Sequence, residues 1–261
     1  MATRIVWDKK LVLKNPVLVT GLPGIGLVGK ICVDYLVKEL KPVRIGRVLS
    51  DSFPPSVHTN NAVIELIADE FFAADLKDFH LVFLAGPVQP NLDFRVGSNV
   101  EHYEFATAVA AAAKSMGVVR MITLAGINVG DKRLEKEPQV IVAATESKLL
   151  AEFSKLGAVA DKKEGLISGA AGLLLGIGAE QGMEGICLMG ETSTRLVYGD
   201  PGAAKRVMEI LVKKFSLSVN LDAISQEAKN IQDAFAQLNQ QMSEAEGKED
   251  DTPENGLSYV H

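Results

Sequence analysis

Short β-rich runs alternate with longer helical patterns along the first two-thirds of the chain, and this alternation narrows the choice of folds more than any motif does. It is typical of an α/β sheet whose strands are joined by crossover helices. Several strand candidates are almost continuously apolar, as expected where helices cover both faces of a sheet. We therefore predict that residues 1–220 form an α/β domain of three layers, with a mostly parallel sheet between two layers of helices. The predicted strands are Pro16–Thr20, Val43–Leu49, Val63–Ile67, Leu81–Ala85, Val118–Ala125, Val140–Ala143 and Ile186–Met189, and the predicted helices are Gly29–Leu40, Asn99–Met116, Glu146–Leu156, Ala170–Glu180 and Pro201–Phe215.

The sequence pattern changes after Asn220. Apolar residues recur at spacings of three and four, and this seam of about three heptads predicts an amphipathic helix over residues 221–242. Residues 243–256 carry six acids against one lysine, so residues 243–261 are predicted to form a disordered acidic tail. Near the end of this tail, Leu257, Tyr259 and Val260 form an apolar, aromatic tip. Such a tip on a flexible tether favours a ligand displayed to a partner protein.

Charge and cysteine content indicate the compartment and the class of partner. A net charge of −6 argues against electrostatic binding of nucleic acid. The two cysteines, Cys32 and Cys187, lie in apolar contexts, as is typical of buried free thiols in a reducing compartment. No secretory signal is visible, and no apolar run reaches about 18 residues, roughly the minimum for a membrane span. We expect a cytoplasmic protein that binds neither nucleic acid nor membrane.

The strongest local motif is VLVTGLPGIGLVGK, in which a strand enters a glycine-rich turn and then an apolar helix. Gly24, Gly26 and Gly29 satisfy the G-x-G-x-x-G pattern of dinucleotide-binding turns. Asp51 follows roughly 20 residues later, where a ribose-binding acid belongs. This pattern gives the first interpretation of the turn, as a site for a dinucleotide.

Two other interpretations of the turn remain open. Gly24, Gly29 and Lys30 also fit the phosphate-binding P-loop, but Ile31 stands where a Ser or Thr hydroxyl should hold magnesium. The third interpretation is structural, because a tight strand-to-helix turn needs glycines for positive φ and close packing.

A second candidate site is the run ETSTR, which follows a predicted strand and contains Glu191, Thr192 and Arg195. Hydroxyls and an arginine in one loop are able to hold an anion, and the simpler interpretation is a loop with local hydrogen bonds. Together with the glycine-rich turn, this loop defines an alternative function, a nucleotide- or nucleoside-binding enzyme. None of the four histidines has metal-ligand spacing from another His or Cys. We expect no catalytic residue, no metal and no cofactor.

Several blocks along the chain resemble the proteasome assembly chaperone type-two family, in its archaeal and bacterial branch. The resemblance spans roughly residues 16–222, and the order and spacing of the blocks make it more specific than any glycine motif. It implies a phosphorylase-like α/β fold, homo-oligomerisation, and a role in guiding or binding the core proteasome. The blocks are GLPGIGLVGK (Gly21–Lys30), CVDYLVKEL (Cys32–Leu40), FLAGPVQP (Phe83–Pro90), TLAGINVG (Thr123–Gly130), LISGAAGLLLGIGAEQGMEGICLMGET (Leu166–Thr192) and DPGAAKRVMEIL (Asp200–Leu211).

The archaeal chaperones that this chain resembles often end in a hydrophobic–Tyr–any motif that docks between proteasome α-subunits. Tyr259 matches that motif in type, but it is third from the end, and Ser258 stands where the hydrophobic residue belongs. If His261 is not native, Tyr259 becomes penultimate. The resemblance implies an assembly chaperone or ATP-independent adaptor that binds the α-subunits through its oligomer and its tail.

Overall fold

The computed structural model of the protein describes residues 3–9, 11–90, 99–161, 164–196, 198–224 and 226, and these form a mixed α/β domain. Nine strands of the described residues make one sheet, in the order β1-β3-β6-β7-β2-β8-β11-β9-β10. The strands are β1 (Arg4–Trp7), β2 (Val17–Thr20), β3 (Val43–Leu49), β6 (Asp69–Leu76), β7 (Phe79–Ala85), β8 (Arg120–Asn128), β9 (Val140–Ala144), β10 (Val159–Ala160) and β11 (Glu184–Thr192). The helices are α1 (Val28–Leu40), α2 (Val100–Ser115), α3 (Lys132–Glu135), α4 (Ser147–Lys155), α5 (Gly169–Glu180) and α6 (Pro201–Phe215), with short 3-10 turns at Ile25–Leu27 and Leu221–Ala223.

The sheet is parallel at its centre and antiparallel at its flanks. Strands β7, β2, β8 and β11 run parallel to one another. On one side β6, β3 and β1 continue the sheet in antiparallel pairings, and on the other side β9 is antiparallel to β11. The prediction of a mostly parallel sheet therefore holds only for the central strands. One reason lies in the connection between β6 and β7, which has only two residues, Lys77 and Asp78. A connection this short joins antiparallel strands, because parallel strands need a long crossover.

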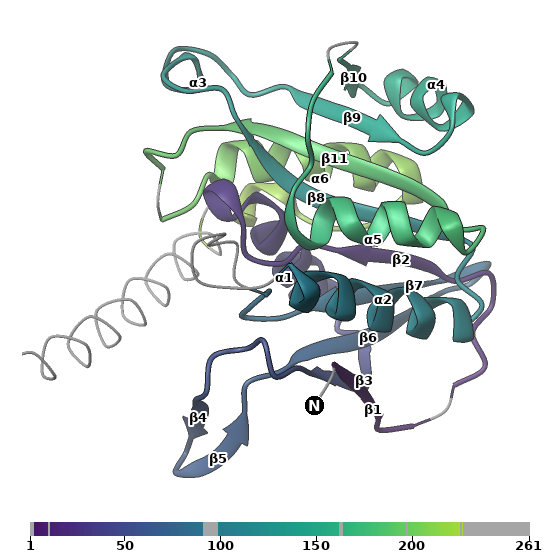
Figure 1. The fold of residues 1–261 in the computed structure, drawn as a ribbon. Helices are drawn as coiled ribbons and strands as arrows, with labels where there is room; N and C mark the ends of the chain where they lie inside the picture. Colours follow the sequence, from purple (N-terminus) through teal and green to yellow (C-terminus); the bar gives the residue numbers. More distant parts are fainter. Residues whose placement is uncertain are drawn as a thin grey trace, which may run out of the picture.

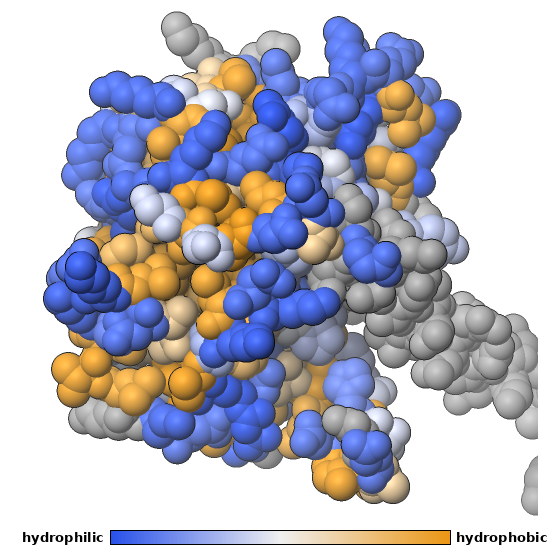
Figure 2. Space-filling view, turned by 180° about the vertical axis from the view of Figure 1, so that it is seen from behind, coloured by the Kyte–Doolittle hydropathy of each residue, from blue (hydrophilic) through white to orange (hydrophobic). Residues whose placement is uncertain are grey.

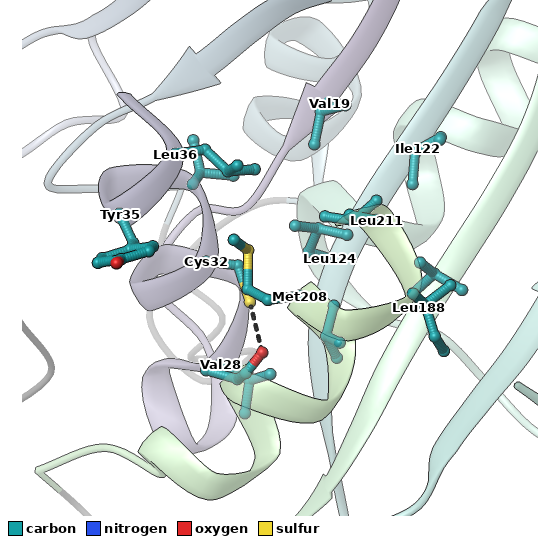
Figure 3. Close-up of a cluster of buried hydrophobic side chains, with 14 of the residues drawn as sticks. Val19, Val28, Cys32, Tyr35, Leu36, Ile122, Leu124, Leu188, Met208 and Leu211 are labelled. Carbon is teal, nitrogen blue, oxygen red and sulfur yellow. Dashed lines mark hydrogen bonds between the residues drawn. The ribbon is translucent and has the colours of Figure 1, made fainter. Parts of the chain in front are cut away.

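Helices cover both faces of the sheet, as predicted (Figure 1). Helices α1 and α6 pack together on one face, and α2 and α5 pack together on the other. Each face has its own buried apolar cluster. Figure 3 shows the cluster under α1 and α6, where Cys32 lies among side chains of both helices and donates a hydrogen bond to the Ala204 carbonyl at 3.4 Å. Burial raises the pKa of the Cys32 thiol far above its ordinary value, so this cysteine is a packing residue.

A separate two-stranded hairpin, β4 (Val57–Asn60) with β5 (Val63–Leu66), projects away from the main sheet (Figures 1 and 2). The predicted strand Val63–Ile67 forms this outer hairpin and is not part of the domain core. Its large apolar side chains are exposed, with Ile64 at 69% of its full accessible area. The exposed side chains of this hairpin form an uncovered apolar surface. An isolated hairpin is only marginally stable in water.

The predicted amphipathic helix over residues 221–242 and the acidic tail over residues 243–261 lie almost entirely outside the described residues. Of this region the structure describes the 3-10 turn Leu221–Ala223, Ile224 and Gln226. Within the described part of the chain, no helix has the length and apolar content needed to cross a membrane.

Candidate functional site at the carboxyl edge of the sheet

The carboxyl ends of the four central parallel strands meet at one edge of the sheet. Strand β2 is followed by α1 on one face, whereas its neighbour β7 is followed by α2 on the other face. Such a reversal opens a crevice between neighbouring strands, and open α/β sheets usually bind ligands there. The glycine-rich turn Gly21–Lys30 connects β2 to α1 at this point, so it occupies the position where a ligand site is expected.

Close backbone approach explains two of the three glycines in the fingerprint. A Cβ atom on Gly29 would lie 2.1 Å from the Leu124 carbonyl oxygen of β8. Gly26 has a φ of +62°, and a Cβ atom there would lie 2.4 Å from Thr192 Oγ1. Gly24 is different, because a Cβ atom on it would meet nothing closer than 3.9 Å. Gly26 and Gly29 thus serve contacts of the protein with itself.

A buried polar network lies against Gly26 on the α6 side of the turn. Thr192 Oγ1 donates to Asp200 Oδ2 at 2.9 Å, and the Asp200 amide donates to the Gly26 carbonyl at 2.8 Å. Asp200 caps α6 by accepting from the Ala203 amide at 2.9 Å, which confirms the helix start predicted at Asp200 and Pro201. Arg133 closes the network with two hydrogen bonds of 2.7 Å to the Asp200 carboxylate. The second glycine of a dinucleotide turn lets pyrophosphate approach, but here Thr192 fills that space.

The structure separates Glu191 and Arg195 from this network. The Glu191 carboxylate accepts a hydrogen bond of 3.0 Å from the Gln139 amide. Arg195 is 69% exposed and forms a surface ion pair with Asp131 at 3.2 Å. Of the residues predicted from sequence to share a ligand site, the structure therefore brings together Gly26 and Thr192, and it directs Glu191 and Arg195 elsewhere.

The other markers of a nucleotide site are also placed apart. Lys30 is buried, with 9% of its full area exposed, and its Nζ pairs with Asp34 Oδ2 at 2.7 Å and donates to the Gly86 carbonyl at 3.2 Å. Asp51 follows β3, which is separated from β2 by β6 and β7. Three strand spacings amount to about 14 Å. These positions do not converge on the glycine-rich turn.

A buried carboxyl group near Lys30 was not expected from the sequence. Asp69, at the start of β6, is fully buried beside Gly86. Burial raises its pKa well above the ordinary value, while the Val88 amide and the Lys30 ammonium act in the opposite direction. No spacing rule identifies Asp69, because it meets Lys30 only through the pairing of β6 with β7. In the described residues no group of three or more His, Cys, Asp or Glu side chains is arranged to hold a metal.

A cavity of about 220 Å³ lies on the opposite, α5 side of the turn. The turn itself, the end of β8 and the start of α5 form its walls. Gln89 connects two of these walls, because its Nε2 donates to the Pro23 carbonyl and its Oε1 accepts from the Ala170 amide at 3.3 Å. Gln89 lies within the block Phe83–Pro90, but no residue pattern marked it as a bridge.

The chain is similar to known proteins in both sequence and fold. The model of the PAC2 family matches residues 18–239. An uncharacterized protein of Methanocaldococcus jannaschii is 32% identical over 221 residues, which cover 84% of this chain and 81% of that protein. Pyrococcus furiosus PbaB, an archaeal proteasome activator, superposes with a TM-score of 0.78 at 30% identity and covers 91% of this chain and 99% of its own. Pyrococcus furiosus PbaA, an archaeal homolog of proteasome-assembly chaperone, gives a TM-score of 0.72 at 26% identity over 94% of this chain and 99% of its own.

The resemblance found in the sequence blocks is thereby confirmed by a family model and by two solved structures. The family match includes the glycine-rich turn, the loop after β11 and the whole central sheet. The chain belongs to the PAC2 family.

Proposed function

We propose that this protein is a non-enzymatic, cytoplasmic partner of the core proteasome, acting as an assembly chaperone or an ATP-independent adaptor. The observation that carries the proposal is the likeness to PbaB and PbaA, which extends over more than nine-tenths of this chain at 26–30% identity. Fold alone does not define function, but these two relatives share both fold and sequence with the chain.

The interior of the candidate site supports a binding role over the nucleotide-enzyme alternative. Thr192 occupies the space beside Gly26, and Lys30 is engaged with Asp34 and Gly86. A phosphate at the turn would have to displace both sets of contacts. Ile31, at the position of the P-loop hydroxyl, is fully buried and has no oxygen to offer a metal.

We further propose that copies of this chain associate through the β4–β5 hairpin. Val57, Ile64 and Leu66 lie on one face of it, since Val57 pairs with Leu66 and Thr59 pairs with Ile64. These three side chains are 48–69% exposed. A contiguous apolar face on a projecting element is typical of a protein contact. A second copy brings the same apolar face, which is the self-complementarity that a two-fold interface requires.

Contact with the proteasome α-subunits is assigned to the tip of the tail, at Leu257, Tyr259 and Val260. Residues 243–256 supply the tether, and an oligomer presents several tips at once, which raises weak single-site binding by orders of magnitude. Tyr259 offers a rigid amphipathic ring, suited to a pocket with a polar base.

Co-sedimentation with the core proteasome of the source organism tests this proposal. Deletion of residues 257–261 should abolish or strongly weaken binding of the full-length protein, and Tyr259→Ala should cause most of the same loss. Tyr198→Ala is the matched control, because Tyr198 is an exposed tyrosine on the folded domain, at 55% of its full accessible area. If the parent protein does not bind, the proposed function is wrong. If both tail variants bind like the parent, the contact lies on the folded domain.

A further inference from the structure

A second hollow lies at the amino edge of the sheet, at the opposite end of the central strands from the candidate site. Its volume is about 410 Å³, within the roughly 300–1,000 Å³ range of pockets that hold ligands. The end of β1, the loop that follows β1 and the end of α2 form its walls (Figure 1). No acidic side chain is found among the described residues that line it. Its apolar lining residues are Trp7, Leu11, Leu13, Ile45 and Met116.

Trp7 forms a fixed and partly exposed wall of this hollow. Its ring stacks on Phe71 with the two centroids 5.6 Å apart. Across the pairing of β1 with β3 it lies against Gly46, where a Cβ atom would come within 2.7 Å of the ring. In spite of these contacts 41% of Trp7 is exposed, and Leu11 in the same hollow is 42% exposed. Because Trp and Met are enriched at protein contacts, the hollow suits an apolar or aromatic side chain of a peptide segment.

The rim of the hollow is basic. Residues 8–14, DKKLVLK, contain three lysines and one acid. That acid, Asp8, is engaged in an ion pair with Arg44 at 2.7 Å. Lys9 belongs to the lining itself. Complementary charges favour the docking of one segment over another, so the segment that fits this hollow combines an apolar or aromatic anchor with acidic residues.

The tail of this chain has that chemistry. Residues 243–256 carry six acids against one lysine, in a chain whose whole net charge is −6. The apolar, aromatic tip follows these acids directly. The tip consists of Leu257, Tyr259 and Val260.

The tip is able to reach the hollow of its own molecule. The tail lies outside the described residues, the last of which is Gln226. From there the predicted helix to residue 242 adds about 24 Å at about 1.5 Å per residue. The 15 residues from 243 to 257 add up to about 50 Å when extended. A domain of about 220 residues is only about 45 Å across, so the tip can reach any part of its surface.

We propose that residues 243–261 dock at this hollow of the same molecule, with the apolar tip against Trp7 and Leu11 and the acids beside Lys9. Tethering raises the effective concentration of the tip to the order of millimolar, so a contact that is weak between separate molecules is occupied within one. The docked tip is withheld from other partners until a stronger site competes for it. This regulatory consequence rests on the proposed function, whereas the docking itself does not.

Trp7 is the single tryptophan of the chain, so its fluorescence reports on this hollow alone. In the full-length protein, the combined changes Leu257→Ser, Tyr259→Ser and Val260→Ser should shift the emission to longer wavelength and raise quenching by acrylamide, because water and quencher then reach the indole. A synthetic peptide of residues 243–261, added to this tip variant, should reverse both changes along a saturable curve. Raising the salt from about 0.05 M to about 0.5 M should weaken the peptide, because salt screens the lysines.

Two substitutions in the hollow keep the Trp7 reporter and test each part of the contact in the tip variant. Lys9→Glu should weaken peptide binding about fivefold. Lys132→Glu is the matched control, because it makes the same charge change at an exposed residue of α3, beyond the other end of β8, and it should leave binding unchanged. Leu11→Ala should also weaken binding about fivefold through lost apolar contact. Unchanged melting temperatures show that each variant is folded.

The proposal is wrong if the tip variant and the parent protein have the same Trp7 emission and quenching, or if the peptide does not bind. It is also wrong if Lys132→Glu weakens the peptide as much as Lys9→Glu does. An emission that changes with protein concentration but not with the tip would mean that a second copy covers the hollow, which overturns docking by the tail. Co-sedimentation with the core proteasome is a separate measurement, so loss of the proposed function leaves these fluorescence results unaffected.

Discussion

Replacement of Asp200 tests whether the network around Thr192 holds the carboxyl edge together. The Asp200 side chain caps α6, accepts from Thr192 and forms two hydrogen bonds with Arg133. It is only 2% exposed, and the Arg133 side chain is 17% exposed. Asp200→Ala removes all of these interactions at once. Asp200→Asn keeps a good helix cap, since Asn and Asp are equivalent there, and removes the charge that pairs with Arg133.

The structure sets the size of both effects. Loss of the cap costs about 1 kcal/mol, and an orphaned Thr192 hydroxyl costs about 1 kcal/mol more. Breaking a buried ion pair by removing one partner costs about 3–5 kcal/mol, and the partial exposure of Arg133 favours the lower end. We expect Asp200→Ala to lose about 5 kcal/mol and Asp200→Asn about 3 kcal/mol. For a chain of this size each kcal/mol lowers Tm by roughly 2–4 °C.

Thermal unfolding followed by circular dichroism measures these losses. Glu209→Gln is the control, because Glu209 pairs with Arg206 on the exposed side of α6 and such pairs contribute less than about 1 kcal/mol. Adding Arg133→Met to Asp200→Asn should recover part of the loss, since it removes the uncompensated cation. If Asp200→Asn has the same Tm as the Glu209→Gln control, the ion pair between Asp200 and Arg133 does not stabilise this edge and the reasoning is refuted.

Two further predictions concern other parts of the domain. The raised pKa of Asp69 means that its protonated carboxyl stabilises the fold at acid pH, and that this contribution is lost as pH rises from the ordinary value of 3.8 through the raised one. At pH 8, Asp69→Asn should therefore have a higher Tm than the parent, by an amount equivalent to roughly 1–3 kcal/mol. If the Tm difference between variant and parent is the same at pH 4 and pH 8, the prediction is wrong. Ile64→Lys should lower the oligomeric mass in analytical ultracentrifugation, whereas Glu65→Lys, on the opposite face of the hairpin, should leave the mass unchanged. If both variants have the same mass as the parent protein, the interface lies elsewhere.

The central strands were predictable because burial on both faces leaves a continuous apolar run in the sequence. Leu81–Ala85 was predicted and lies within β7, where all five of these residues are buried. Helix α6 was predicted from Pro201 to Phe215 because a capping acid precedes a proline. Strand β6, Asp69–Leu76, was missed. It carries an acid near each end. Because Asp is depleted in strands, strand propensity gave no reason to begin a strand at the buried Asp69. Helix α3 was also missed, because Lys132–Glu135 lies in a charged run that is typical of a loop.

The candidate site was less predictable than the fold, because its contacts join segments far apart in the sequence. The glycine spacing correctly marked a tight turn, but it carries no information on what fills the turn. Thr192 reaches Gly26 only because β11 lies two strands from β2, and Arg133 reaches Asp200 from the short helix α3, which follows β8. Hydrogen bonds of this kind depend on the order of strands, which hydrophobic periodicity does not specify.

The division of the carboxyl edge bears on how a PAC2-family chain uses this topology. On the α6 side, Thr192, Asp200 and Arg133 satisfy one another, so that half of the crevice is closed without any ligand. A fold completed by its own side chains does not depend on a nucleotide for stability, and this suits a protein that must present the same surface to a partner at all times. On the α5 side the crevice stays open as a cavity of about 220 Å³, so only this half has room for a bound molecule.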